Sequence, residues 1–158
     1  MKIAISGHRG LPADTERLVE QALRSHLHQL TNTHVTGISC LADGADQLFA
    51  RAVLDLGGTL EVIIPAEQYR DGLPDSTHAA YDDLLGNAAT VHRLESIEST
   101  SESHMAASRM MLDHADQLGA VWDGQPARGY GGTADVVAEA HRHNLPVTVV
   151  WPVGVRRD

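Results

Sequence analysis

The sequence has one cysteine, few basic residues and no long hydrophobic run. Cys40 alone cannot form an internal disulfide, which favours a reducing compartment. No apolar run approaches the roughly 18 residues that a membrane-spanning helix needs, so no membrane partner is expected. Residues 1–6 form a strand-like apolar run and not a basic leader with a cleavage site. These features together predict a cytoplasmic protein.

Basic side chains are outnumbered by acidic ones. Twelve Lys and Arg stand against twenty-one Asp and Glu, which gives a formal charge of −9. This charge repels a phosphate backbone over most of the surface and argues against nucleic acid as a partner. A small phosphorylated ligand remains compatible with it, because a few backbone amides and one or two Arg in a cleft can bind phosphate whatever the overall charge.

Aromatic residues make up only 4% of the chain, so the core must consist mainly of Val, Ile, Leu and Ala. Such cores are typical of parallel sheets covered by helices. At 158 residues, the chain is expected to form one domain over 1–158.

Apolar periodicity predicts six strands separated by five helices, because short β-branched runs alternate with amphipathic stretches of helical spacing. Right-handed crossovers between such strands produce a parallel sheet with helices on both faces. The expected fold is therefore α/β, a three-layer αβα sandwich with a mainly parallel sheet of about six strands. The strands are expected at 2–6, 35–40, 60–65, 90–94, 118–122 and 147–151.

Three loops that follow strands carry residues suited to ligand binding. In an open parallel sheet such loops meet beyond the carboxyl ends of the strands, where helix amino termini present unpaired N–H groups. The first loop contains Gly7, His8, Arg9 and Gly10. Its glycines permit close backbone approach and its Arg can pair with an anion. A tight turn with a surface Arg is the structural alternative.

The second loop contains Asp43, Gly44 and Asp46. Asp43 stands where a helix N-cap is expected, with Gly44 in the first turn. An acidic residue at this place can instead accept hydrogen bonds from ribose hydroxyls, although the spacing differs from the dinucleotide-binding fingerprint. The residues alone do not decide between capping and ribose binding.

The third loop, which follows the apolar strand at 118–122, is the strongest candidate for phosphate binding. It has four glycines in nine residues, which is costly in backbone entropy unless the loop needs unusual torsions or close contact with a ligand. Its last residues would direct several N–H groups and a helix dipole at one point, which suits a phosphate. The structural alternative to phosphate binding is a flexible surface loop in which Thr133 is the N-cap of the following helix. The candidate ligand residues are Asp123, Arg128, Gly131, Gly132 and Thr133.

The third loop matches neither of two common nucleotide motifs. No Gly-Lys-Ser/Thr follows, as in a Walker A loop, and no G-x-G-x-x-G stands after the first strand. The sequence thus argues against ATP hydrolysis and ordinary NAD redox chemistry.

The sequence resembles the SLOG superfamily over nearly its whole length. This Rossmann-like group includes the LOG phosphoribohydrolases and the DNA-processing protein DprA. The resemblance rests on Gly7-His8-Arg9, on Ala42-Asp43-Gly44-Ala45-Asp46, which looks like the Gly-Ala-Asp segment of the YspA-like branch, and on Gly131-Gly132-Thr133, which is similar to the LOG Gly-Thr phosphate loop. It implies a Rossmann-like fold, a nucleotide or nucleotide-derived phosphorylated ligand, and no required cofactor. Family members often form dimers, so a homodimer is also expected.

The resemblance implies a nucleotide sensor or binding protein, with two alternatives. One is a nucleoside 5′-monophosphate N-ribohydrolase, in which Asp135 resembles the family's catalytic Glu and Arg109 lies near the position of its Arg. A helix-dipole contact for Asp135 and a solvated position for Arg109 are the structural alternatives. The other is a DprA-like module that contacts single-stranded DNA, which the net charge and the lack of aromatic residues beside basic ones oppose.

The sequence has ten histidines, which are common metal ligands, but their spacing does not predict a metal site. His26 and His28 are two apart on a predicted helix and point to opposite sides, and so do His141 and His143. No Cys-x-x-Cys or His-Glu-x-x-His occurs, so a zinc site would have to be assembled from distant loops. No metal site is expected, and the histidines other than His8 are expected at the surface.

Overall fold

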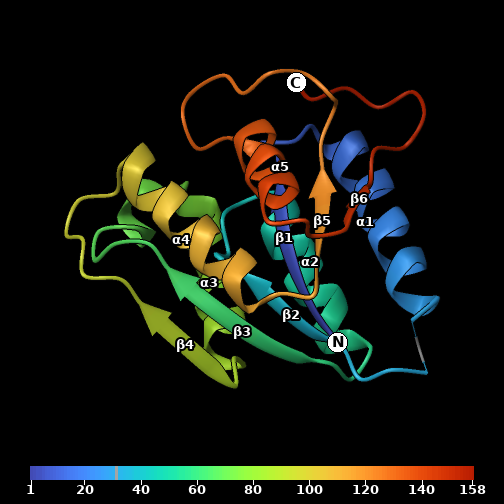
Figure 1. The fold of residues 1–158 in the computed structure, drawn as a ribbon, viewed down its shortest axis with the longest axis horizontal. Coiled ribbons are helices and arrows are strands. Elements are labelled where there is room, and N and C mark those ends of the chain that lie inside the picture. Colours follow the sequence, from blue (N-terminus) through green and yellow to red (C-terminus); the bar gives the residue numbers. More distant parts are fainter. Residues whose placement is uncertain (31) are drawn as a thin grey trace.

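The computed structural model describes residues 1–30 and 32–158 of the protein. Its centre is a six-stranded sheet in the order β4-β3-β2-β1-β5-β6, in which every neighbouring pair is parallel (Figure 1). This confirms the predicted α/β class and all six predicted strands. The strands are β1 Lys2–Gly7, β2 Thr36–Ser39, β3 Thr59–Ile64, β4 Thr90–Arg93, β5 Gln117–Val121 and β6 Val147–Val149.

Five α-helices cover the sheet, with α1, α2 and α3 on one face and α4 and α5 on the other (Figure 1). Two short 3-10 turns, η1 Arg70–Gly72 and η2 Asp75–Thr77, precede α3. The three layers are those of a Rossmann-like sandwich. The helices are α1 Ala13–His28, α2 Ala45–Asp55, α3 His78–Gly86, α4 Ser101–His114 and α5 Thr133–Arg142.

The core follows the alternation of strand side chains. Ile3 and Ile5 pack into the cluster formed with α1 and α2, whereas Ala4 between them faces the cluster formed with α4 and α5. All three side chains are at most 1% exposed. Because successive residues of a strand point to opposite faces, one short apolar run supplies both halves of the core.

Strand β1 lies between β2 and β5, which places the reversal of strand order at the centre of the sheet. The chain leaves β1 toward α1 on one face and leaves β5 toward α5 on the other. In open α/β sheets a crevice forms beyond the carboxyl ends of the strands at such a switch point. The loops after β1 and β5 therefore flank the place where a ligand is expected.

Within the described ranges 1–30 and 32–158, the structure contains no helix that is both long and apolar enough to cross a membrane. The cytoplasmic location and the homodimer remain predictions.

Candidate functional site

A cavity of about 340 Å³ lies at this switch point. The loop after β1 and the glycine-rich loop before α5 both line it. Nine of the twelve predicted ligand residues are at its wall, whereas Asp43, Gly44 and Asp123 are not. The nine are Gly7, His8, Arg9, Gly10, Asp46, Arg128, Gly131, Gly132 and Thr133.

Asp43 positions the first loop and does not cap α2. Its Oδ1 accepts a hydrogen bond from Arg9 Nε at 2.8 Å, and its Oδ2 accepts one from Gly10 N at 3.0 Å. The N-cap of α2 is Gly44, and no side chain caps it, so the N-cap interpretation was wrong. Because only Nε is bound, the terminal amino groups of Arg9 have no hydrogen-bond partner among the described residues.

Gly44 lets the start of α2 approach the first loop. Its φ is +85°, and a Cβ there would lie 2.6 Å from the carbonyl oxygen of His8. Gly7 is equally confined, since a Cβ would lie 2.3 Å from the Cβ of Ala45. These two glycines are required by backbone packing, and only Gly7 also lines the cavity.

Asp46 is the buried carboxyl of the cavity wall. Its side chain belongs to the first turn of α2, and Oδ2 accepts a hydrogen bond from Ala42 N at 3.2 Å. Burial raises the pKa of Asp46 to about 7, although the Ala42 N–H and the positive charge of Arg9 act in the other direction. Of the two acidic residues considered for this loop, the structure places Asp46 at the cavity.

The raised pKa of Asp46 predicts a pH-dependent stability. The folded chain keeps a proton that the unfolded chain loses above the ordinary pKa of 3.8, so this group's contribution is lost as pH rises from about 4 to about 7. Asp46→Asn does not titrate and should gain up to about 4 kcal/mol relative to the parent protein over that range, at about 1.36 kcal/mol per pKa unit. Urea denaturation of both proteins at several pH values measures this gain, and a pH-independent difference would contradict it.

The glycine-rich loop supplies fewer donors than the sequence suggested. Gly131 N donates to Asp135 Oδ2 at 2.9 Å, and Gly132 N donates to Gly129 O at 3.3 Å, so neither N–H is available to an anion. The N–H groups of Thr133 and of the following Ala134 have no partner among the described residues. The donors at the amino end of α5 are thus these two, together with the helix dipole.

The two predicted catalytic residues, Asp135 and Arg109, do not line the cavity. The carboxylate of Asp135 closes the glycine-rich loop through Gly131 N. Arg109 extends along the surface of α4, where Nη2 donates to Tyr130 Oη at 3.2 Å and Nε lies 3.7 Å from Glu139 Oε1. Both side chains are engaged away from the cavity in this structure, and their role as a catalytic pair stays a prediction.

His8 and Asp123 anchor the two central loops to each other. His8 Nε2 accepts a hydrogen bond from Asp123 N at 3.1 Å, and Asp123 Oδ1 lies 3.2 Å from the same nitrogen. Burial lowers the pKa of His8, and the charge of Arg157 lowers it further, whereas Asp123 acts in the other direction. Because Nε2 accepts the Asp123 N–H, the proton of a neutral ring is on Nδ1. Within the described part of the chain this Nδ1 has no partner. Asp123 therefore holds the loops together from outside the cavity wall.

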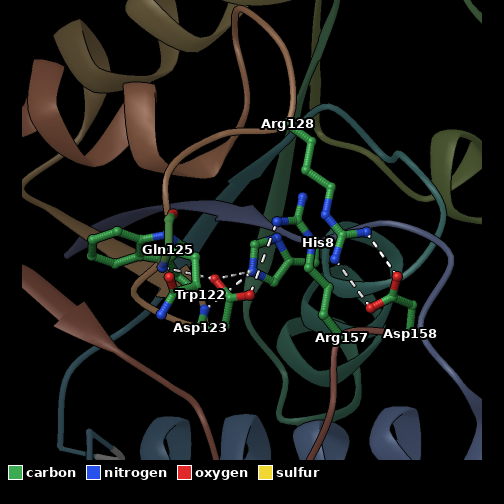
Figure 2. A network of polar contacts seen from close by, with 7 residues as sticks. All are labelled: His8, Trp122, Asp123, Gln125, Arg128, Arg157 and Asp158. Carbon is green, nitrogen blue, oxygen red and sulfur yellow. Dashed lines mark hydrogen bonds and ion pairs between the residues drawn. The ribbon is translucent and has the colours of Figure 1, made fainter.

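Arg128 and Arg157 lie close to the His8–Asp123 pair at the cavity wall (Figure 2). Arg128 donates from Nη1 and Nη2 to the two carboxylate oxygens of Asp158, at 2.9 and 3.1 Å. Arg157 lies between this pair and the His8–Asp123 pair, with Nη1 4.0 Å from Asp123 Oδ2 (Figure 2). With Arg9, three Arg side chains line a cavity in a chain of net charge −9.

Part of the cavity wall was missed by the sequence analysis. It includes His104, which was expected at the surface, because α4 turns its i, i+4 pair His104 and Ser108 inward. Burial lowers the pKa of His104, and the nearby Arg9 adds to this. The i, i+4 spacing of two polar residues among apolar ones was the available indication. The missed wall residues are Cys40, Pro65, Tyr69, His104, Ser108 and Met111.

No protein-family model and no curated protein matches the sequence. Solved structures match the fold. DprA from Streptococcus pneumoniae has a TM-score of 0.66 at 19% identity, over 94% of this chain and 49% of its own. DprA from Helicobacter pylori has a TM-score of 0.69 at 17% identity, over 94% and 64%. The Moco carrier protein from Chlamydomonas reinhardtii has a TM-score of 0.57 at 15% identity, over 96% and 77%.

These matches confirm the predicted Rossmann-like fold. The chain spans about half of the first DprA and under two thirds of the second. The Helicobacter pylori protein has a described single-stranded DNA binding mode, so the expectation against nucleic acid remains a prediction for this chain.

Proposed function

We propose that the cavity binds a nucleoside 5′-monophosphate or a closely related nucleotide-derived ligand, and that the protein is a nucleotide sensor or binding protein. The observation that carries this proposal is that Arg9 and Thr133, whose N–H group is unpaired among the described residues, line one cavity. The unpaired N–H group of Ala134 follows in the same first turn of α5. Unpaired N–H groups at a helix amino terminus bind phosphate readily. Arg amino groups pair with phosphate oxygens through charge-assisted hydrogen bonds.

Charge also favours an anion at this place. Arg9, Arg128 and Arg157 line the cavity, and only the Arg128 guanidinium has a bidentate carboxylate partner, Asp158. That pair is exposed, so its contribution is small and an incoming phosphate can compete with it. These positive charges support a phosphate in a chain that is otherwise acidic.

The remaining wall suits a ribose and a base. The Asp46 carboxyl can exchange hydrogen bonds with ribose hydroxyls, and Tyr69 and Met111 offer apolar contact for a base. Small-molecule sites have volumes of about 300–1,000 Å³. A cavity of about 340 Å³ lies at the lower end of that range and favours one nucleotide over a dinucleotide.

The test is a thermal-shift panel on the full chain, followed by calorimetry of the hits. At least one nucleoside 5′-monophosphate should raise Tm clearly more than its nucleoside does, since ligand at 100 times Kd stabilises the folded state by about 2.7 kcal/mol. An oligo-dT strand serves as the nucleic-acid arm. A shift with oligo-dT but with no mononucleotide, or no shift at millimolar mononucleotide, would overturn the proposal.

Hydrolysis of the ligand is a second candidate, and one observation favours it. A carboxyl with a pKa of about 7 at the cavity wall can act as general acid or base near neutral pH, and Asp46 is such a group. The protein is incubated with the nucleotides of the same panel, and the products are separated by chromatography. The parent protein should release free base, whereas Asp46→Asn should not. Absence of base at high protein concentration would remove this candidate.

A further inference from the structure

A second cluster of titratable side chains lies on the sheet face that α4 covers, away from the cavity. Glu61 is in β3, His92 is in the neighbouring strand β4, and His114 is the last residue of α4. Figure 1 shows this end of α4 lying over β3. None of the three lines the cavity at the carboxyl ends of the strands. The cluster needs an explanation of its own.

Both imidazoles converge on one carboxylate oxygen. His92 Nε2 lies 2.8 Å and His114 Nδ1 lies 3.0 Å from Glu61 Oε1. The two ring centroids are 5.1 Å apart, and the rings are nearly perpendicular, at 88° between their planes. The three ligand atoms all lie within 4.8 Å of one another, which is close enough for one ion to contact all of them.

We propose that Glu61, His92 and His114 form a binding site for a divalent transition metal of the Zn²⁺ type. Two imidazoles and one carboxylate are a ligand set that Zn²⁺ takes in sites with an open fourth position. The carboxylate is 7% exposed, whereas His92 and His114 are 28% and 32% exposed, so the charged ligand is buried and the imidazoles border solvent. This arrangement provides both the ligands and an entry path.

Lys2 is the competitor for this ion. Its Nζ lies 3.5 Å from Glu61 Oε2, on the carboxylate oxygen that the imidazoles leave free. A positive charge so close disfavours a cation. The Lys2 side chain is 49% exposed and can turn into solvent. A bound metal would therefore replace an ion pair that contributes little to stability. The hydrogen bonds from the imidazoles to Oε1 would be replaced by coordination bonds of about 2.0–2.2 Å.

Calorimetric titration of the full chain with Zn²⁺ at neutral pH tests the site. We expect one-to-one binding that His92→Ala and His114→Ala each weaken by about tenfold or more, since outer-shell partners alone contribute about 10- to 100-fold. Lys2→Gln should tighten binding. His141→Ala is the matched control, because this exposed histidine of α5 lies outside the cluster.

A Co²⁺ absorption spectrum provides a second readout, since its visible bands report imidazole coordination and should change in both histidine variants. Circular dichroism shows whether the variants remain folded. Absence of saturable one-to-one binding would overturn the proposal. Binding that persists in both histidine variants, or that is lost in His8→Ala instead, would overturn it as well.

Discussion

Replacing Arg9 with Gln is expected to weaken the binding of a nucleoside 5′-monophosphate by about 10- to 100-fold. Hydrogen bonds to charged groups contribute about 1.5–3 kcal/mol, and each 1.4 kcal/mol is tenfold in Kd. Asp43 holds Arg9 through Nε, so the guanidinium is already oriented when the ligand arrives. Little ordering cost then offsets its interaction with the phosphate. Calorimetric titration with the best mononucleotide of the panel measures the change.

Two further variants make this result specific. Asp43→Asn keeps the shape of the side chain but weakens its hold on Arg9 and should lower affinity by a smaller factor. Arg17→Gln removes an equal charge from the exposed face of α1 and should leave affinity unchanged. If Arg9→Gln bound the nucleotide as tightly as the parent protein does, the anion would have to sit elsewhere.

Replacing Gly44 with Ala is expected to cost about 2–6 kcal/mol of stability. A non-glycine residue at φ +85° carries backbone strain, typically about 1–3 kcal/mol. The new Cβ would also lie 2.6 Å from the His8 carbonyl oxygen, and overpacking adds about 1–3 kcal/mol. Urea denaturation measures the loss as a lower transition midpoint with an unchanged slope.

Other glycines provide matched controls for this loss. Gly57 has φ +80° but nothing within 4 Å of a Cβ, so Gly57→Ala should show the strain without the clash. Gly86 ends α3 with open space around it, and Gly86→Ala should be neutral or slightly stabilising. A Gly44→Ala loss no larger than that of Gly57→Ala would show that the close approach of α2 to the first loop is not needed.

The fold was predictable because the apolar patterns that identify strands and helices are local in the sequence. The β1 run Ile3-Ala4-Ile5 and the helical spacing of the intervening segments each report their own element, and right-handed crossovers then fix a parallel sheet. Only element ends differ, as at β6, which ends at Val149 instead of residue 151. Strand ends depend on pairing with the neighbouring strand, which the local sequence does not report.

The site was predictable only where strand ends meet. The loops after β1 and β5 had to face each other once the sheet was parallel. The use of Asp43 to hold Arg9, and of Asp135 to bind Gly131 N, was not predictable, because hydrogen bonds made by side chains within loops depend on the loop torsions. The convergence of His92 and His114 on Glu61 depends on strand register and helix packing, which histidine spacing along the chain cannot show.

The most direct test of nucleotide binding at the cavity is a crystal structure with a nucleoside 5′-monophosphate bound. We expect phosphate oxygens within hydrogen-bond distance of the Thr133 and Ala134 N–H groups and of Arg9, with the ribose toward Asp46. A nucleotide bound with its phosphate away from the amino end of α5, or one absent from the cavity at millimolar concentration, would contradict the account.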